Sequence, residues 1–274
     1  MASPQLIALH QRANAGDPEA VAFTAVVAAL GVGERPSWSR ALDRLKRAAK
    51  LGSASAEGQL AVLEASGFIG PPRPIKEHRL LADPRITSLP GFLPAPACEW
   101  LVGRAAGHTR LAETYDPKTG ERHVDPERNN SAIGFAFPAF DLVIVAIRAR
   151  IATAIGAPVQ RLEPAQVLHY APGQQFGRHH DFLDPDLPGL AAEVASRGQR
   201  VATFLIYLNS GFEGGETDFP LVGVTYKGEP GDGLTFANVD RAGGPDRRTL
   251  HAGLPPRSGE KWLFSQWIRN RTAI

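Results

Sequence analysis

The sequence predicts an α+β protein in which a helical N-terminal region precedes a C-terminal part built from short strands. Between about residues 4 and 66, apolar residues recur at helical spacing. From about residue 166 onward, short runs of β-branched and aromatic residues alternate with Gly, Pro and Asp clusters, which is the pattern of a β-sandwich or jelly roll. The 28 glycines and 23 prolines among 274 residues also favour many turns over a helical bundle.

The N-terminal region carries helix-start signals and a weak internal repeat. Asp17 stands before Pro18, and Ser37 stands before the next helical run, as N-cap residues do. The segments Ala13–Ala20 and Ala49–Ala56 align with a shift of 36 residues, which resembles tetratricopeptide-like helix-turn-helix units. Stacked repeats need about three copies to bury a continuous core. We therefore expect this region either to pack on the rest of the protein or to hold a protein partner.

A proline-rich break over Gly67–Pro74 divides the chain, because consecutive prolines cannot continue a helix. We expect a helical repeat region over residues 1–66, a linker over 67–82 and the main domain over 83–274. The elements predicted in the main domain are a short strand with a turn over Pro84–Leu93, helices over Ala95–Ala106 and Ala139–Ile155, and strands over Val201–Leu208, Gly233–Ala237 and Lys261–Arg269.

Composition excludes several classes of protein. The 30 basic and 28 acidic residues leave a net charge of +2, which predicts no nucleic-acid or anionic-membrane partner. The longest apolar stretch, Val21–Gly33, is too short to span a bilayer, and Asp17 and Glu19 stand where a signal peptide would be basic. The single cysteine, Cys98, cannot form an intrachain disulfide. We expect a cytoplasmic protein with no membrane segment.

The residue types with the clearest chemistry are His179, Asp181 and, 70 residues further on, His251. Two imidazoles and one carboxylate bind one face of a metal and leave three positions open, which suits non-haem Fe(II). On a strand, His179 and Asp181 point to the same side and His180 to the other, because side chains alternate. Taken alone, however, a His-x-Asp pair is more often a surface turn than a metal site.

The sequence around these residues resembles the prolyl 4-hydroxylase family of 2-oxoglutarate- and Fe(II)-dependent dioxygenases. The resemblance extends over about Ile86–Arg269 and leaves only the helical N-terminus outside. It rests on Tyr170–Phe176 (YAPGQQF), Gly214–Pro220 (GGETDFP), His251–Gly253 (HAG) and Gly259–Trp262 (GEKW). The resemblance implies a double-stranded β-helix (jelly-roll) oxygenase core with supporting helices.

The resemblance also implies roles for individual residues. It makes His179, Asp181 and His251 the iron ligands. It makes Lys261 the residue that binds the C5 carboxylate of 2-oxoglutarate, with Tyr170 and Thr217 lining the same pocket. It places Arg200, Glu163 and Trp267 on the substrate side, where a solvated strand-edge arginine and a core tryptophan are the ordinary alternatives. The turn-rich stretch Tyr115–Ser131 is expected to be a substrate-covering loop or an ordinary flexible one.

Charge supports the assignment of Lys261 independently of the family. The far carboxylate of 2-oxoglutarate needs a partner, since a buried unpaired carboxylate would cost several kcal/mol. Lys261 begins a strand, Trp262–Phe264, in which the pattern alone would place an apolar residue. A solvated lysine at the strand end is the alternative interpretation.

The expected function is therefore an enzyme, a 2-oxoglutarate-dependent hydroxylase that uses Fe(II) and O₂ and releases succinate and CO₂, with ascorbate as a further candidate cofactor. The retained Asp181 implies hydroxylation, because related halogenases leave that position to a small residue. A prolyl residue in a peptide or protein is the leading substrate. Departures from the family pattern, Arg128–Ser131 (RNNS) and Leu254–Pro256 (LPP), keep a free amino acid or other small metabolite open. A non-catalytic interaction protein that uses the helical repeats is the alternative from another class. The sequence does not indicate an oligomeric state.

Overall fold

The structure, a computed structural model, describes residues 4–70, 73–116, 119 and 121–272. These residues form two compact units. The first unit holds the chain up to Arg73 together with Phe137–Arg150, and the second holds Pro74–Ala136 and Ile151–Ile274. The expected linker, residues 67–82, contains the first of these breaks. The segment Phe137–Arg150 comes from within the range that we assigned to the main domain.

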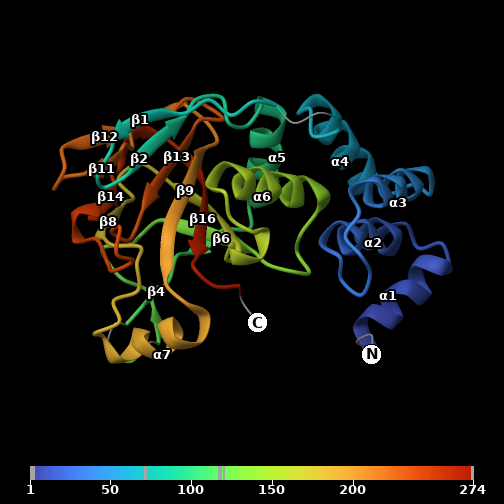
Figure 1. The fold of residues 1–274 in the computed structure, drawn as a ribbon. Helices are drawn as coiled ribbons and strands as arrows, with labels where there is room; N and C mark the ends of the chain where they lie inside the picture. The colour runs from blue at the N-terminus through green and yellow to red at the C-terminus, as the bar shows by residue number, and fades with distance from the viewer. Residues whose placement is uncertain (1–3, 71–72, 117–118, 120, 273–274) are drawn as a thin grey trace. The chain divides into compact units, whose positions relative to one another are not determined.

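The first unit is helical (Figure 1). Its helices are α1 (Pro4–Asn14), α2 (Pro18–Leu30), α3 (Trp38–Lys50), α4 (Ala54–Ala65) and the first turns of α6 (Leu142–Ile155). The predicted N-caps are present, since the Asp17 carboxylate accepts from two backbone N–H groups of α2 and the Ser37 hydroxyl accepts from one of α3. These bonds satisfy donors that a helix start leaves without partners inside the helix.

Packing in the first unit covers the apolar faces of these helices. Leu42, Leu45 and Leu63 are buried. The Gln59 side chain of α4 accepts a hydrogen bond of 2.9 Å from the backbone N–H of Leu142, at the start of α6. Helix α4 therefore caps the start of α6, a helix whose last residues belong to the second unit. The tetratricopeptide-like nature of the repeat stays a prediction.

The second unit combines short helices with antiparallel sheets (Figure 1). Its elements before the central strands are β1 (His78–Leu81), β2 (Ile86–Leu89), α5 (Ala95–Ala105), β3 (Arg110–Leu111), β4 (Thr114–Tyr115), β5 (Arg122–His123) and β6 (Ser131–Phe135). There follow η1 (Val159–Arg161), β7 (Ala165–Tyr170), β8 (Phe176–His179), α7 (Pro188–Arg197), β9 (Arg200–Tyr207), β10 (Phe212–Gly214), β11 (Thr217–Phe219), β12 (Val224–Tyr226), β13 (Gly233–Ala237), η2 (Arg247–Thr249), β14 (His251–Gly253), β15 (Pro256–Gly259) and β16 (Lys261–Arg269).

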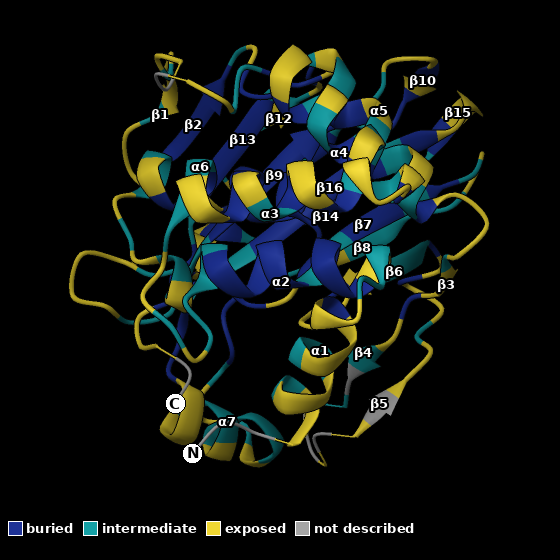
Figure 2. Ribbon diagram, turned by 90° about the vertical axis from the view of Figure 1, so that its right-hand side faces the viewer, coloured by how far each residue is buried: buried dark blue, intermediate teal, exposed yellow. Residues whose placement is uncertain are grey.

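Two sheets form the jelly roll. The larger has the order β1-β2-β13-β9-β16-β7-β6-β3 and the smaller β12-β11-β14-β8, with every pair antiparallel. Leu205 and Leu263 of the large sheet pack in one core with Phe219 of the small sheet and Phe212 of β10. Figure 2 shows the central strands β9, β13 and β16 as mostly buried. The predicted α+β class with a jelly-roll core is confirmed.

Strand register brings the chemistry-bearing residues together. The β8–β14 pair sets His179 opposite His251, and the β7–β16 pair sets Tyr170 opposite Lys261. The predicted strands at β9, β13 and β16 are present, with bounds that differ from the prediction by at most one residue. Residues far apart in the sequence thus become direct neighbours in the small sheet and in the large one.

The expected loop over Tyr115–Ser131 is more regular than predicted. It contains the hairpin β4–β5, and residues 117, 118 and 120 lie outside the described part of the chain. Its last turn pairs with the start of β8, since Gly177 donates to the Glu127 carbonyl and Asn129 donates to the Gln175 carbonyl. A substrate-covering role for this loop stays a prediction. Among the described residues, no helix is both long and apolar enough to cross a membrane.

Candidate active site

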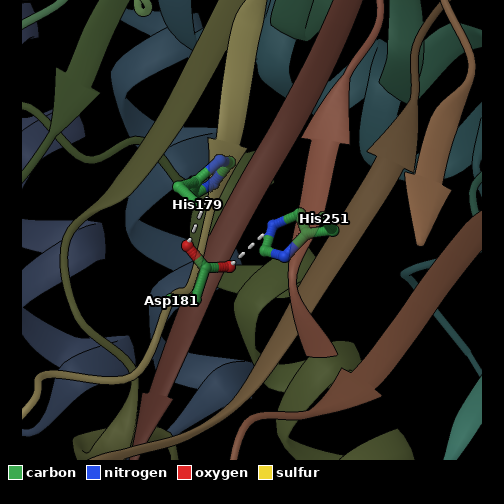
Figure 3. A group of neighbouring side chains, drawn as sticks. All are labelled: His179, Asp181 and His251. Atoms are coloured by element: carbon green, nitrogen blue, oxygen red, sulfur yellow. Dashed lines mark ion pairs between the residues drawn. The ribbon is translucent and has the colours of Figure 1, made fainter. Parts of the chain in front are cut away.

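Three side chains that could hold a metal ion meet at the edge of the small sheet. His179 ends β8, His251 begins β14, and Asp181 follows β8 (Figure 3). The two carboxylate oxygens of Asp181 each lie 3.6 Å from an imidazole Nε2, one of His179 and one of His251. One ligand atom of each residue lies within 4.8 Å of the others. One ion with bonds of about 2.0–2.2 Å can reach two donors that lie 3.6 Å apart, so the set fits a metal bound on one face.

The strand argument made from the sequence is only partly right. His179 and Asp181 do face the same centre. However, β8 ends at His179, and pairing between strands therefore does not fix the position of Asp181. A hydrogen bond does so instead, since the Thr203 hydroxyl on β9 donates to Asp181 Oδ2 at 2.6 Å. His180 turns away, and its Nε2 lies 3.0 Å from the Arg247 carbonyl oxygen.

The tautomers of both histidines are set by backbone carbonyls. His179 Nδ1 lies 2.8 Å from the Gly177 oxygen, and His251 Nδ1 lies 3.0 Å from the Thr249 oxygen. A carbonyl oxygen can only accept, so that each Nδ1 carries the proton and each Nε2 presents a lone pair to the centre. The Phe176 ring stacks on His179 with centroids 3.4 Å apart, which fixes the plane of that imidazole.

Burial and charge keep the donors in the protonation states that a metal requires. Burial alone would raise the pKa of Asp181, but its interactions with His251 and His179 and the Thr203 hydrogen bond hold it below its usual range. Burial lowers the pKa of His251 to about 4. A carboxylate and a neutral imidazole are the forms that bind metal, so the chemistry of this donor set fits Fe(II).

An inner cavity of about 30 Å³ adjoins the metal centre and contains the predicted co-substrate residues. Lys261 is fully buried there, and its Nζ has no hydrogen-bond partner in the described part of the chain. The ammonium lies 4.9 Å from the centre of the Tyr170 ring and 5.4 Å from that of Tyr207. Burial lowers the pKa of Lys261 to about 7. An unpaired buried cation beside a metal centre fits the far carboxylate of a chelating dicarboxylate.

The other two predicted co-substrate residues line the same cavity. Tyr170 is buried, and burial raises its pKa. Tyr207 donates its hydroxyl proton to the Tyr226 carbonyl, so Thr217, 2.9 Å away, is the donor in their shared hydrogen bond. The lone pairs of Thr217 remain available on the cavity side.

An outer cleft of about 540 Å³ adjoins the same triad and is lined by His179, His180 and Asp181. His179, Asp181 and Trp267 line both spaces, whereas Arg200 and Glu163 line only the cleft. The solvated strand-edge alternative for Arg200 does not hold, because this side chain is buried. It donates to the Glu163 carboxylate with Nε at 2.7 Å and Nη2 at 3.0 Å. Its guanidinium lies 3.7 Å above the Trp267 ring.

Sequence reasoning missed two residues of the site. Arg128 is buried, lines both spaces and lies 4.4 Å over the Phe176 ring. Its Nη1 donates to the Glu113 carbonyl at 2.7 Å, while its Nε has no partner among the described residues. The only sequence signal for Arg128 is the polar run Arg128–Ser131. No sequence signal marks Thr203 as a site residue, because threonine is common in β-strands.

Comparison with known proteins identifies the relatives of this chain. Residues 165–269 match the model of the 2OG-Fe(II) oxygenase superfamily. Prolyl 4-hydroxylase 1 of Arabidopsis thaliana is 33% identical over 211 residues, which are 72% of this chain and 73% of that protein. Prolyl 4-hydroxylase 13 of the same plant is 30% identical over 218 residues, covering 71% and 74%.

A solved structure with a similar sequence also has a similar fold. It is the 2-oxoglutarate complex of the viral collagen prolyl hydroxylase from Paramecium bursaria Chlorella virus-1. The identity is 31% and the TM-score 0.53, over 67% of this chain and 95% of that one. The match covers nearly all of a hydroxylase that binds 2-oxoglutarate, and it leaves about a third of this chain outside.

Proposed function

Because the chain belongs to the prolyl 4-hydroxylase-like 2-oxoglutarate- and Fe(II)-dependent oxygenases, we propose that it hydroxylates a prolyl residue in a peptide or protein. The observation that carries this proposal is the meeting of two spaces at one metal centre. The inner cavity contains the unpaired ammonium of Lys261, and the outer cleft opens on the same His179 and Asp181. Co-substrate on one side and substrate on the other would thus share a single reactive centre.

The metal ligands and the three predicted co-substrate residues each have a role in this proposal. His179, Asp181 and His251 hold Fe(II). Lys261 pairs with the C5 carboxylate of 2-oxoglutarate, beside Tyr170 and Thr217. Iron, 2-oxoglutarate and O₂ together supply the oxidising chemistry, with succinate and CO₂ as co-products.

The chain itself contributes orientation and exclusion of water. Leu168, Leu205 and Leu263 line the inner cavity, so the co-substrate would meet an apolar wall apart from its charged partners. In the cleft, Trp267 offers an aromatic face to the substrate, and Arg200 lies against that ring. Glu163 acts through Arg200, because it holds two nitrogens of the guanidinium. The prolyl carbon to be hydroxylated would lie between this wall and the metal.

A second substrate class is favoured by one observation, the unpaired Nε of Arg128. A buried guanidinium N–H beside the metal centre suits a carboxylate, such as that of a free amino acid. The cleft volume of about 540 Å³ also lies in the range usual for small-molecule sites. The same chemistry on a small metabolite is therefore the second candidate.

The test measures turnover and product together. With Fe(II) and O₂, the enzyme should convert 2-oxoglutarate to succinate faster when a proline-rich peptide is added, and mass spectrometry should find one added oxygen on a prolyl residue. Asp181→Ala should do neither. Stimulation by free proline or another amino acid but by no peptide would favour the second candidate. A protein that neither binds Fe(II) nor consumes 2-oxoglutarate would contradict both, and would favour an interaction role for the helical repeats.

We also propose that ascorbate acts as a reductant that restores Fe(II) after turnover without substrate.

A second proposal is that the protein is cytoplasmic. Cys98 is buried, and burial raises its pKa to about 12, so it has no thiolate to form an intermolecular disulfide. A reducing cytoplasmic environment suits such a thiol.

A further inference from the structure

A chain of side-chain hydrogen bonds leads to Asp181 from the large sheet. Asn238, which follows β13, donates with Nδ2 to the Thr203 hydroxyl at 3.0 Å. Thr203, on β9, donates to Asp181 Oδ2 at 2.6 Å. Asn238 and Thr203 are almost completely buried, at 0% and 1% exposure. Bulk solvent does not reach these two side chains, so their hydrogen bonds are shielded from exchange with it.

The direction of this chain of hydrogen bonds is set by its members. Thr203 has one hydroxyl proton, and an ionised carboxylate can only accept. Because Asn238 supplies the hydrogen for its bond to Thr203, the Thr203 oxygen accepts there and its proton must go to Asp181. The amide thus fixes which way the hydroxyl points.

We propose that Thr203, oriented by Asn238, is the positioning residue that makes Asp181 bind iron through Oδ1 alone. This inference rests on the metal centre of the proposed function. Asp181 lies beyond the end of β8 and therefore lacks the strand pairing that places His179. Each carboxylate oxygen lies 3.6 Å from one imidazole Nε2, Oδ1 from that of His179 and Oδ2 from that of His251. The Thr203 hydroxyl engages only Oδ2, and this bond is what distinguishes the two oxygens and leaves Oδ1 for the metal. A carboxylate held by one oxygen keeps the remaining positions free for 2-oxoglutarate and O₂.

The backbone of Asn238 is also linked to the second buried ligand, His251. The backbone carbonyl of Asn238 accepts from the Asp246 backbone N–H at 3.1 Å, and the backbone carbonyl of Asp246 accepts from the Thr249 hydroxyl at 2.7 Å. The Thr249 carbonyl in turn accepts from His251 Nδ1. Asn238 is therefore a junction between the supports of Asp181 and His251.

The chain offers a matched control for the loss of a buried hydroxyl. Thr235 lies on β13 and donates its hydroxyl to the Thr203 carbonyl at 3.0 Å. Thr235→Val thus removes a buried hydroxyl that bonds to the same residue, Thr203, but leaves the bond to Asp181 in place. Any general cost of losing such a hydroxyl appears in both valine variants, and only the effect on Asp181 is specific to Thr203→Val.

The experiment is an anaerobic Fe(II) titration of the full chain, with Co(II) as a spectroscopic probe of coordination. Thr203→Val should weaken Fe(II) binding about 10–100-fold, the range usual for loss of such a supporting bond, and should change the Co(II) d–d spectrum. It should also raise the KM for 2-oxoglutarate more than it lowers kcat. Thr203→Ser should restore wild-type binding and spectrum, and Thr235→Val should leave both unchanged.

The outcomes separate this inference from the function it rests on. Wild-type protein that binds no Fe(II) would remove the metal centre itself. Wild-type binding with equal Fe(II) affinity and Co(II) spectra in Thr203→Val and Thr235→Val would overturn only the role of Thr203. If Thr203→Val does not fold, Thr203→Ala provides the hydroxyl-free variant without the extra methyl group. Failure of both to fold, with Thr203→Ser and Thr235→Val intact, would show a structural role instead and would also overturn the inference.

Discussion

Two buried regions of the oxygenase unit treat charge in opposite ways. At the outer cleft, which Glu163 and Arg200 line, Glu163 accepts from Arg200 and Arg269, and Arg269 also bonds to Glu193. Burial alone would raise the pKa of Glu163, but the two guanidiniums lower it. Every charge in this network has an opposite charge within hydrogen-bond distance. The network therefore needs nothing from outside the protein.

At the metal centre and inner cavity, the buried charges lack such partners. Asp181 faces two histidines, and Lys261 Nζ has no hydrogen-bond partner in the described part of the chain. A buried charge without a hydrogen-bonded counter-charge is costly, so these groups suit ligands that bring the opposite charge. The ion network around Glu163 is therefore structural, whereas Asp181 and Lys261 belong to a binding site.

The largest effect is expected at Asp181. Asp181→Ala should lower 2-oxoglutarate turnover by at least ~10³-fold, because the metal loses its one anionic ligand. The melting temperature of the metal-free protein should stay within a few degrees, since the variant removes a buried charge that has no Lys or Arg partner. A turnover assay with Fe(II) and a thermal melt with chelator measure the two. Retained turnover would show that another residue completes the site.

The next effect is on stability, in the other region. Glu163→Gln leaves Arg200 and Arg269 buried beside a neutral amide, which should cost about 3–5 kcal/mol of unfolding free energy, or on the order of 10 °C in Tm. Glu193→Gln, at a half-buried position, should cost much less. Chemical denaturation of the metal-free variants measures both. Equal losses would mean that the network does not depend on Glu163.

Lys261→Met should behave in the opposite manner to Glu163→Gln. The KM for 2-oxoglutarate should rise roughly 10–100-fold, because a charged hydrogen bond to a carboxylate contributes about 1.5–3 kcal/mol. The empty protein should become more stable, since an unpaired buried cation is replaced by an apolar side chain of similar length. Steady-state kinetics and a thermal melt report the two changes. A destabilised variant with unchanged KM would place Lys261 in the structural group.

The pH dependence of co-substrate binding sharpens the comparison further. Burial lowers the pKa of Lys261 to about 7 in the empty cavity, and a bound carboxylate favours the ammonium form. Below pH 7 the lysine is already protonated, so affinity should be level. Above pH 7 binding must take up a proton, so affinity should fall by up to about tenfold per pH unit. Anaerobic calorimetry of the Fe(II) protein, in buffers of different ionisation enthalpy, measures this uptake. Lys261→Met should take up no such proton.

Much of this site could be predicted from the sequence, because its signals are local. The strands around Val201–Leu208 and Lys261–Arg269 are short runs rich in apolar, β-branched and aromatic residues, and this composition predicts buried strands. His179, Asp181 and His251 have the residue types that a metal requires. The resemblance supplied the role of Lys261, which composition alone presents as a lysine at a strand end.

The remainder depends on long-range register that no local pattern encodes. The pairing of Arg200 with Glu163 joins strand β9 to a loop 37 residues earlier. The hydrogen bonds of Thr203 join a residue on β9 to Asn238, which follows β13, and to Asp181, which follows β8. Thr203 and Arg128 carry no signal of their own, since one is a usual strand residue and the other lies in a polar run. Their roles appear only once the sheets place them beside Asp181 and Phe176.

The smallest effect is expected at His180, which tests the register of the whole site. Its side chain leaves the metal centre, and its Nε2 lies by the Arg247 carbonyl while its ring lies 4.6 Å from that of Phe182. Because it is partly exposed and binds no metal, His180→Ala should change Fe(II) affinity less than about twofold and stability by about 0.5 kcal/mol. His179→Ala is the matched control and should abolish Fe(II) binding. The reverse result, with iron lost in His180→Ala and kept in His179→Ala, would shift β8 by one residue and exchange its two faces.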